Sequence, residues 1–427
     1  MALAVVLGTV GRLTVVGCSI EVHKQLVGVA AKDETPWLDG GSTAARGRHD
    51  DPAISRVVGL DKARANRHKV SRMRSDGSGF FENSLESLLD ARRLGSRLRE
   101  QQQISRKQNS VNNMIITGDD LEEIADLQGR LANEFEMKNL GGLKYFLGIE
   151  VARSKEGIFL SQRKCVLDLL AKDGMLECKP ADTLIVQNHK LGEFPYQVPT
   201  NKDRYQRLVG RLIYLSHTRP DIAYAIGVVS QFMHAPSEEH MNVAVRILRY
   251  LKSAPGKGLF FAKNGHLEVE GFTDADWAGS IFDRRSTSGY FTFVGGNLVT
   301  WRSKKQKVVA LSSAEAEFRG VAKGLCELLW LKMLMTELGF PPESEMRLFC
   351  DNKAAIEISH NLVQHDCTKH VEVDRHFVKQ NLDAKVMKFP FVRSEDQLAD
   401  VLTKALSNRA FHSSLVKLGI KDIFSPA

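Results

Sequence analysis

An α/β fold is predicted by three features of the sequence, with a mixed sheet flanked by helices in the C-terminal part of the chain. The first is a series of short apolar runs bounded by turn residues, which is typical of strands. The second is Glu315–Leu338, whose apolar residues recur at helical spacing until Gly339 and Pro341 end the helix. The third is a return to alternating strand-like and helical segments after that helix.

The elements expected in this part of the chain follow from the same patterns. The tight turn Gly295–Asn297 joins two strands into a hairpin. The helices expected after the long one are Lys369–Asn381 and Glu395–Ala405, and the second of these closes the domain. The expected strands are Val269–Thr273, Gly289–Val294, Leu298–Ser303, Val308–Ser312, Met346–Cys350 and Val386–Val392.

A second block precedes this one. The apolar runs Phe146–Val151 and Ile158–Leu160 flank residues with turn chemistry, which predicts a hairpin. The Gly- and Lys-containing stretch Ser253–Gly258 indicates a boundary. Other elements expected here are a strand at Met114–Ile116 and helices at Leu121–Phe135, Tyr205–Leu215, Ala223–Phe232 and Met241–Leu251.

Composition places the 427 residues among globular proteins of two or three domains, with 43% hydrophobic and 26% charged residues. The net charge is +8, and residues 1–107 carry +6 of it. This permits an anionic partner such as nucleic acid. Residues 1–109 are expected to be a mostly disordered basic region, which serves either as a nucleic-acid arm or as a solvated tail without function.

The cysteines and the apolar runs exclude several other classes. The six cysteines form no close pair, so neither a disulfide framework nor a zinc site is expected. No window holds the roughly 18 apolar residues of a membrane span. Residues 1–20 are broken by glycines and an arginine, so no targeting signal is expected. We therefore expect an intracellular protein, in the cytoplasm or nucleus, without a membrane partner.

Four acidic residues are placed where their side chains can converge. Asp274 and Asp351 end predicted strands, Glu317 lies near the start of the long helix, and Asp400 lies in the closing helix. Clustered carboxylates without His or Cys ligands suit Mg²⁺, a hard ion that prefers oxygen ligands. Two such ions can activate water and neutralise the transition state of phosphodiester hydrolysis. Each acid taken alone is more often a solvated charge.

The residues around these acids resemble the ribonuclease H (RNase H) domain of Pol polyproteins from copia-type LTR retrotransposons. The motifs that carry the resemblance are Phe272–Gly279, Leu311–Phe318, Cys350–Ala355, Thr368–Asp374 and Gln397–Lys404. The resemblance implies an RNase H-like five-stranded mixed sheet over residues 265–420. It also implies cleavage of the RNA strand of an RNA–DNA hybrid with two divalent ions, Mg²⁺ or Mn²⁺.

The resemblance further assigns Asp274, Glu317, Asp351 and Asp400 as catalytic metal ligands. Asp276 is the alternative to Asp274. Glu317 is preferred over Glu315 because Gly320, Gly324 and Leu325 match the spacing of the family's helix. Many RNase H enzymes carry a His before the last Asp, and Val392–Asp396 has none. Candidate contacts to the nucleic acid, close in sequence to the first strands, are Arg284, Arg285, Arg302, Lys304 and Lys305.

The upstream block resembles the reverse transcriptase of the same polyproteins. Leu143–Val151 is similar to the primer grip, and Tyr214–Ala225 and Ile247–Lys252 are similar to the thumb and connection. Residues 110–258 would thus be a partial reverse transcriptase: the end of the palm followed by a mostly helical thumb and connection.

Two departures suggest that this polymerase is truncated and inactive. The family's metal-binding Tyr-Val-Asp-Asp is replaced by Ser110–Asn113, in which Asn112 and Asn113 stand for the two acids, and residues 1–109 show no fingers or palm motifs. The first hypothesis is therefore a Pol-derived fragment with RNase H activity. The alternatives are a catalytically inactive nucleic-acid-binding remnant and a cellular protein with an unrelated basic N-terminal domain.

We predict that the protein does not extend a DNA primer on an RNA template. Asparagine offers a neutral carbonyl where the polymerase needs a carboxylate for Mg²⁺. The double variant Asn112→Asp, Asn113→Asp should also fail, because the other metal ligand and the nucleotide site have no counterpart in this chain. A gel-based extension assay checks both forms, and extension by either one would contradict the prediction.

Overall fold

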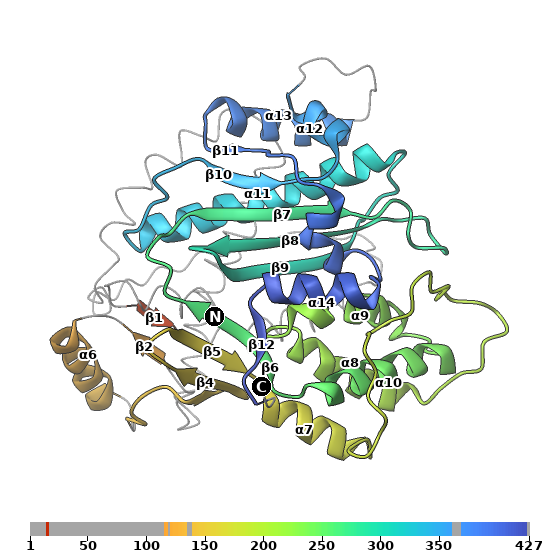
Figure 1. The fold of residues 1–427 in the computed structure, drawn as a ribbon, viewed down its shortest axis with the longest axis horizontal. Coiled ribbons are helices and arrows are strands. Elements are labelled where there is room, and N and C mark those ends of the chain that lie inside the picture. Colours follow the sequence, from red (N-terminus) through yellow and green to blue (C-terminus); the bar gives the residue numbers. More distant parts are fainter. Residues whose placement is uncertain (1–13, 17–114, 118–119, 135–138, 361–368, 425–427) are drawn as a thin grey trace, which may run out of the picture. The chain divides into compact units, whose positions relative to one another are not determined.

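Two five-stranded sheets organise the computed structural model, which describes residues 14–16, 115–117, 120–134, 139–360 and 369–424 (Figure 1). The mixed sheet has the spatial order β11 (Met387–Lys388), β10 (Met346–Phe349), β7 (Val269–Ala275), β8 (Thr287–Val294) and β9 (Asn297–Lys305). The antiparallel sheet has the order β12 (Ile420–Asp422), β6 (Lys257–Ala262), β5 (Gly157–Ser161), β4 (Ile149–Arg153) and β3 (Tyr145–Phe146). A separate pair joins β1 (Thr14–Val16) to β2 (Ile115–Thr117).

The mixed sheet confirms the predicted fold class. Strands β7, β8 and β9 are antiparallel neighbours, whereas β10 runs parallel to both β7 and β11. The long helix α11 (Ser313–Glu337) packs on β7 and β8, and α12 (Lys353–His360) and α13 (Lys369–Asp383) lie beside it (Figure 1). Five strands of mixed direction flanked by helices are the RNase H-like arrangement that the sequence predicted.

Small residues set how closely α11 approaches the sheet. A Cβ added at Gly320 would lie 3.2 Å from Oγ1 of Thr273, and one added at Gly324 would lie 3.1 Å from the side chain of Leu348. Ser312 fixes the start of the helix, since its side chain accepts a hydrogen bond from the amide of Glu315. The contact at Gly320 is one residue from Asp274, so this packing positions the start of α11 beside the end of β7.

Helices from the upstream block pack against the antiparallel sheet and reach the mixed sheet. They are α7 (Arg163–Lys172), α8 (Lys202–Leu215), α9 (Ala223–Val229) and α10 (Glu238–Ser253), whereas α6 (Leu121–Glu134), which precedes them, is mostly exposed. The indole nitrogen of Trp301 in β9 donates a hydrogen bond of 3.0 Å to the carbonyl of Ser216 at the end of α8. The two sheets therefore share one continuous set of packed elements.

The chain ends by returning to the antiparallel sheet. Helix α14 (Asn408–Lys417) follows the mixed-sheet elements, and β12 then pairs antiparallel with β6. Neither α14 nor β12 was predicted from the sequence. The boundary placed between residues 258 and 265 crosses β6, and the division into a 110–258 part and a 265–420 part stays a prediction.

Several expected elements differ in detail. The hairpin is confirmed as β4 and β5, but Phe146–Val151 is split by a turn in which Leu147 and Gly148 both have positive φ. Val308–Ser312 was predicted to be a strand and is a loop. It lies beyond the end of β9 and no described strand pairs with it, which leaves Val308, Val309 and Leu311 exposed.

The last two predicted elements are also shorter than expected. Of Val386–Val392 only β11 is a regular strand, because Pro390 has no amide hydrogen to donate to a strand ladder. The segment expected as the helix Glu395–Ala405 consists of two 3₁₀ helices, η4 (Ser394–Asp396) and η5 (Leu398–Leu402).

A buried ion pair lies beneath the helices of the upstream block. Nη2 of Arg219 lies 2.7 Å from Oδ2 of Asp221, and the hydroxyl of Tyr250 donates to the same oxygen at 2.6 Å. The side chains of Arg219 and Asp221 are 1% and 0% exposed. Burial by itself would raise the pKa of Asp221, but Arg219 and Tyr250 hold that pKa below its usual value.

We predict that Asp221→Asn lowers the free energy of unfolding by about 3–5 kcal/mol, because it leaves the guanidinium of Arg219 buried without a counter-charge. Chemical denaturation monitored by circular dichroism measures the loss. Asp126→Asn is the control, since it removes the carboxylate of an exposed ion pair with Arg130 and should cost less than about 1 kcal/mol. Equal effects of the two substitutions would contradict the prediction.

Candidate active site

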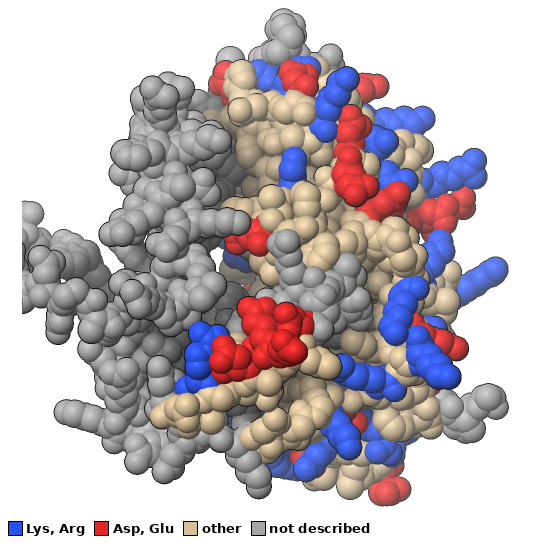
Figure 2. All heavy atoms as spheres, turned by 90° about the vertical axis from the view of Figure 1, so that its left-hand side faces the viewer, with Lys and Arg blue, Asp and Glu red and all other residues tan. Residues whose placement is uncertain are grey.

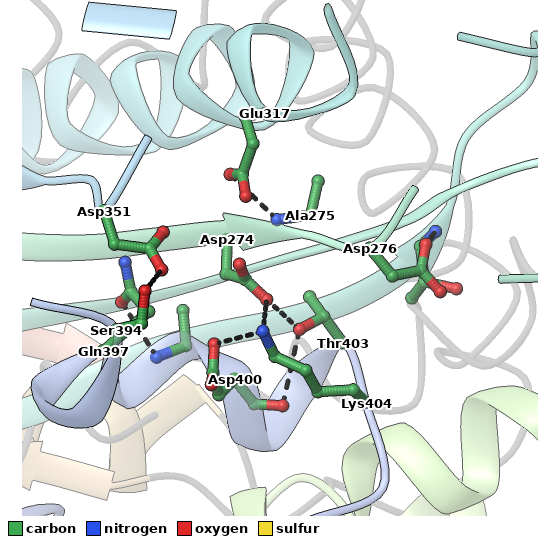
Figure 3. Close-up of polar contacts among 12 residues, drawn as sticks. Asp274, Ala275, Asp276, Glu317, Asp351, Ser394, Gln397, Asp400, Thr403 and Lys404 are labelled. Carbon is green, nitrogen blue, oxygen red and sulfur yellow. Dashed lines mark hydrogen bonds and ion pairs between the residues drawn. The ribbon is translucent and has the colours of Figure 1, made fainter. Parts of the chain in front are cut away.

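The four predicted carboxylates converge at one end of the mixed sheet (Figure 3). Asp274 lies near the end of β7 and Asp351 follows β10, its parallel neighbour. Parallel strands end at the same edge of a sheet, which brings these two acids together. Glu317 comes from the beginning of α11 and Asp400 from η5. Four separate elements thus contribute one carboxylate each.

The carboxylates form two overlapping groups. Ligand oxygens of Asp274, Asp351 and Asp400 all lie within 4.8 Å of one another. The second group consists of Glu317, Asp351 and Cys350, whose ligand atoms (a carboxylate oxygen from each acid and Sγ) also lie within 4.8 Å of one another. Asp351 belongs to both groups, so an ion held by either one would share this residue with an ion held by the other.

Asp351 also has an oxygen suited to a cation. Its Oδ2 accepts a hydrogen bond of 2.8 Å from the hydroxyl of Ser394. Its Oδ1 is buried and has no hydrogen-bond partner. Burying a carboxylate oxygen without a partner is costly. Together with an all-carboxylate donor set, this orphaned oxygen fits a hard divalent cation.

Cys350 is not expected to be a ligand. Burial, followed by the negative charge of Glu317, raises the pKa of its thiol far above the usual value. Because Mg²⁺ is a hard ion that prefers oxygen ligands to sulfur, the carboxylates are the expected ligands of the second group.

Lys404 partly neutralises this cluster. Its Nζ lies 2.9 Å from Oδ1 of Asp400 and 3.7 Å from Oδ2 of Asp274. Thr403 adds a hydroxyl that donates to Oδ2 of Asp274 (Figure 3). Burial opposes the charge on Lys404, but Asp274 and Asp400 raise its pKa above the usual value. An ammonium group therefore lies between two of the acids.

Lys404 and Thr403 were not among the predicted site residues. The sequence contains one indication for Lys404. It follows Asp400 by four residues, which is a spacing typical of ion pairs on a helix. The contact of each residue with Asp274 depends on how η5 sits against β7, and sequence spacing carries no information about that.

The acids that face each other have altered protonation. Burial, and then the charges of Asp274 and Asp351, raises the pKa of Glu317 well above its usual range. Its Oε2 accepts a hydrogen bond of 3.0 Å from the amide of Ala275, which holds the side chain over the end of β7. Burial and Asp274 raise the pKa of Asp400 to about 7. In the absence of metal, the cluster therefore retains protons at neutral pH.

The two alternative acids lie outside the cluster. Asp276 follows the end of β7, and its Oδ1 accepts a hydrogen bond from the amide of Thr287, which closes the loop between β7 and β8 (Figure 3). Glu315 pairs with Arg319 at 2.8 Å and accepts a hydrogen bond from the amide of Leu311 at 2.7 Å. Both carboxylates have local structural partners. The geometry therefore favours Asp274 and Glu317 as ligands, although their roles remain predictions.

The five basic residues predicted to contact nucleic acid fall into two sets. Lys305 pairs with Asp283 at 2.8 Å, and Arg285 lies 3.6 Å from the same acid. Arg284, next to them in the loop, has a positive φ of 54°. Through Asp283, Lys305 and Arg285 stabilise the loop between β7 and β8. This structural role accounts for both residues without a contact to nucleic acid.

Arg302 and Lys304 form the other set, together with Lys323 of α11. Burial, and then the charges of Arg302 and Lys304, lowers the pKa of Lys323 to about 8. The Nζ of Lys323 donates a hydrogen bond of 2.8 Å to the hydroxyl of Ser288. Three cations are thus close enough to affect one another, and Lys323 was missed because nothing in the sequence shows that α11 packs on β8, the neighbour of β9.

The charge on the rest of the described surface is more mixed. The face drawn in Figure 2 has acidic and basic side chains interspersed among its coloured residues, so it offers no continuous basic surface. Asn112 and Asn113, and the predicted disordered region, lie outside the described residues. Within the part of the chain that the structure describes, no helix is long and apolar enough to cross a membrane.

Residues 108–187 match the reverse transcriptase (RNA-dependent DNA polymerase) family. The chain is 41% identical over 313 residues to a retrovirus-related Pol polyprotein from transposon RE1 of Arabidopsis thaliana, covering 73% of this chain and 21% of that protein. It is 37% identical over 313 residues to the corresponding polyprotein from transposon TNT 1-94 of Nicotiana tabacum, covering 70% and 23%. The chain thus spans about a fifth of the length of these relatives.

Solved structures with low sequence identity are also similar. LC11-RNase H1 in complex with an RNA/DNA hybrid is 16% identical, with a TM-score of 0.25, and is matched over 35% of this chain and 99% of that one. The foamy viral protease-reverse transcriptase in complex with an RNA/DNA hybrid is 10% identical, with a TM-score of 0.38 and coverage of 70% and 37%.

The raised pKa values predict that the metal-free protein loses stability as pH rises from about 5 to 8. Asp400 has an ordinary pKa when unfolded and one of about 7 when folded, so the folded chain binds the extra proton in between. Glu317 shifts in the same direction. The melting temperature in EDTA should fall on the order of 5 °C, since 1 kcal/mol corresponds to about 2–4 °C in a domain of this size.

Asp400→Asn serves as the control for this pH dependence. It removes one of the titrating groups and barely changes volume, so the melting temperature should vary less between pH 5 and 7 than in the wild type. Mg²⁺ should oppose the loss at pH 8, because it replaces the bound protons. A wild-type melting temperature that rises with pH in EDTA would contradict this assignment of the carboxylates.

Proposed function

Because the chain belongs to the family of Pol polyproteins from copia-type retrotransposons, we propose that its mixed-sheet part hydrolyses the RNA strand of RNA–DNA hybrids with divalent metal. The single observation that carries this proposal is the convergence of Asp274, Glu317, Asp351 and Asp400 from four elements. A surface charge has no reason to be buried beside three others. Binding of cations by the carboxylates would offset the cost of placing them together.

The residues themselves suggest how the site would work. Mg²⁺ or Mn²⁺ ions, when bound, supply an activated water and neutralise charge that develops on the phosphate. Asp274, Asp351 and Asp400 would hold one ion, and Glu317 and Asp351 a second. Glu317 must lose its proton to act as a ligand, so metal affinity should rise with pH. The hydrogen bonds from Thr403 and from the amide of Ala275 orient Asp274 and Glu317.

Lys404 would have to yield to an ion bound between Asp274 and Asp400. Its side chain is 43% exposed, so it can leave the carboxylates for solvent or for a phosphate of the substrate. Ser394 is the side chain that contacts Asp351 in the loop where many RNase H enzymes have a histidine. A hydroxyl is neither a strong acid nor a strong base, so proton transfer would depend on water or on substrate groups at this position.

Substrate would be bound mainly through its phosphates. The candidate phosphate contacts are Arg302 and Lys304 of β9 and Lys323 of α11, three cations close enough to affect one another. Lys/Arg contacts to phosphates release counterions, so affinity for a hybrid should fall as salt rises. The reverse transcriptase part is proposed to be inactive, since Asn112 and Asn113 replace the polymerase acids.

One observation favours a second candidate, a nucleic-acid-binding remnant without activity. Lys404 already neutralises Asp274 and Asp400, so the cluster can persist without metal. If this ion pair is permanent, the protein will bind hybrids but will not cleave them. Metal-dependent cleavage by the full chain separates the two candidates.

We predict that Asp274→Asn, Glu317→Gln and Asp351→Asn each reduce cleavage of a hybrid by about 100-fold or more. Changes in the partners of metal ligands typically cost 10–100-fold, and loss of a ligand should cost at least as much. Asp400→Asn should be milder, because Asp400 belongs to only one of the two groups. A fluorescent hybrid with a labelled RNA strand measures the rate with Mg²⁺ and with Mn²⁺.

Glu315→Gln is the matched control for Glu317→Gln. Glu315 lies two residues from Glu317, and the change from acid to amide is the same. It removes the ion pair with Arg319 but leaves an amide oxygen that can accept the hydrogen bond from Leu311. Its rate should stay near that of the wild type, and circular dichroism should show that all variants are folded. Cleavage by Asp351→Asn at the wild-type rate, with unchanged metal dependence, would overturn the proposed site.

A further inference from the structure

A basic cleft lies apart from the carboxylates, where the segment after α7 meets α10 and the start of α14. Its volume is about 400 Å³. Basic side chains of Lys179, Arg246 and Arg249 line it, and Asp182 is the acid among the lining residues. The charges of these four side chains sum to +2. An anion is therefore the class of ligand that this cleft favours.

Arg246 is held in place within the cleft. Its Nε donates a hydrogen bond of 3.1 Å to the carbonyl of Thr183, and its Nη2 donates one of 2.8 Å to the hydroxyl of the same residue. The amide of Ala181 donates to the carbonyl of Arg249 at 3.2 Å, which fixes the segment along α10. A guanidinium held in this way loses little entropy when it binds an anion, and its remaining N–H groups match phosphate oxygens.

The other two cations of the cleft are not engaged in ion pairs within the described part of the chain. Neither Lys179 nor Arg249 forms an ion pair with any residue that the structure describes, and both are exposed. Arg249 follows Arg246 by three residues on α10, so the two lie on one face of the helix. Asn408, the first residue of α14, also lines the cleft, and the amide groups of a first helical turn favour negative charge.

The lining favours a backbone phosphate over a free nucleotide. None of the residues lining the cleft is aromatic, so a base has no ring to stack on. A smaller cavity of about 20 Å³ shares Thr183 with the cleft and is lined by Lys404, which contacts Asp274 and Asp400. Thr183 of the cleft and Lys404 of the carboxylate cluster therefore line the same small cavity.

We propose that this cleft binds a phosphate of the RNA–DNA hybrid at a distance from the carboxylates. The proposal rests on the proposed function, because it assigns the same substrate. The hybrid is bound at two places: the scissile phosphate at the carboxylate cluster, and a phosphate further along one strand at Lys179, Arg246 and Arg249. Residues of the reverse transcriptase-like part thus help to position the substrate of the RNase H-like part.

The test compares Arg249→Gln with Arg211→Gln in the full chain. Arg211 is an exposed arginine of α8 that does not line the cleft, so it controls for the loss of one positive charge. Binding of a fluorescent hybrid is measured by anisotropy in EDTA over a range of salt concentrations, so that metal-dependent cleavage does not interfere. Arg249→Gln should weaken binding several-fold and reduce the salt slope by about 1, the value for one lost phosphate contact. Arg211→Gln should change neither.

A length series and inorganic phosphate distinguish the source of the phosphate. When cleavage by the wild type and by Arg249→Gln is compared in Mg²⁺, the effect of the substitution on KM should disappear for hybrids too short to reach from the carboxylates to the cleft. Stabilisation of the wild type by millimolar inorganic phosphate, with hybrid binding unaffected by Arg249→Gln, would assign the cleft to a small phosphate ligand and overturn the proposal. Equal binding by the two variants, or no binding of hybrid by the wild type at low salt, would also overturn it.

These outcomes are independent of those for the proposed function. A wild type that binds hybrid through Arg249 but never cleaves it would contradict the RNase H activity and leave the cleft in place. Cleavage of the hybrid by the wild type, with no effect of Arg249→Gln on binding, would support the RNase H activity and contradict the proposed role of the cleft.

Discussion

Repulsion among four carboxylates, held close together and largely out of water, is the constraint on which the site depends. Like charges at this separation strongly disfavour full ionisation in a medium of low dielectric constant. In the metal-free protein, three features reduce this repulsion. Glu317 and Asp400 retain protons, Lys404 supplies a positive charge, and Asp274 receives a hydrogen bond from Thr403. Each of these is a partial substitute for bound cations.

The surrounding fold holds these groups together despite their repulsion. Gly320 lets α11 approach β7 closely enough for Glu317 to reach the amide of Ala275. The side chain of Gln397 donates to the carbonyl of Thr273 at 3.0 Å, and Ser303 donates to the carbonyl of Leu402 at 2.6 Å. These two bonds fasten both ends of η5 to the sheet. The chain then continues through α14 to β12, so the segment that carries Asp400 is also anchored in the antiparallel sheet.

This arrangement connects the two parts of the chain physically. The C-terminal strand completes the antiparallel sheet, and Trp301 of the mixed sheet binds the end of α8. The basic cleft draws its residues from α10, from the segment after α7 and from α14. Under the proposed function, a catalytically inactive reverse transcriptase part would therefore still support the carboxylate site and contact the substrate.

Much of this could be predicted from the sequence, where local patterns decide the structure. Apolar runs bounded by turns located most strands, and acids at strand ends located Asp274 and Asp351. The choice between Asp274 and Asp276 could not be made from pattern alone, since alternate residues of a strand share a face. The structure separates them because β7 ends at Ala275, beyond which the chain turns.

Other features depended on tertiary contacts. Val308–Ser312 has the composition of a strand, but no described strand pairs with it, and the carbonyl of Ala310 accepts a hydrogen bond from Trp277. Asp400 was expected in a regular helix and lies in a 3₁₀ helix held by Gln397 and Leu402. The role of Lys404 required knowing that η5 faces β7. Packing between distant segments decides each of these, and local propensity does not.

The central claim is that the carboxylate cluster is a cation site in which Asp351 is shared. Counting bound Mn²⁺ by electron paramagnetic resonance, on the full chain with hybrid present, tests it most directly. The account predicts two ions per wild-type chain, one for Asp400→Asn, and none for Asp351→Asn at concentrations that saturate the wild type. Wild-type protein without bound Mn²⁺, or Asp351→Asn that still binds two ions, would contradict it.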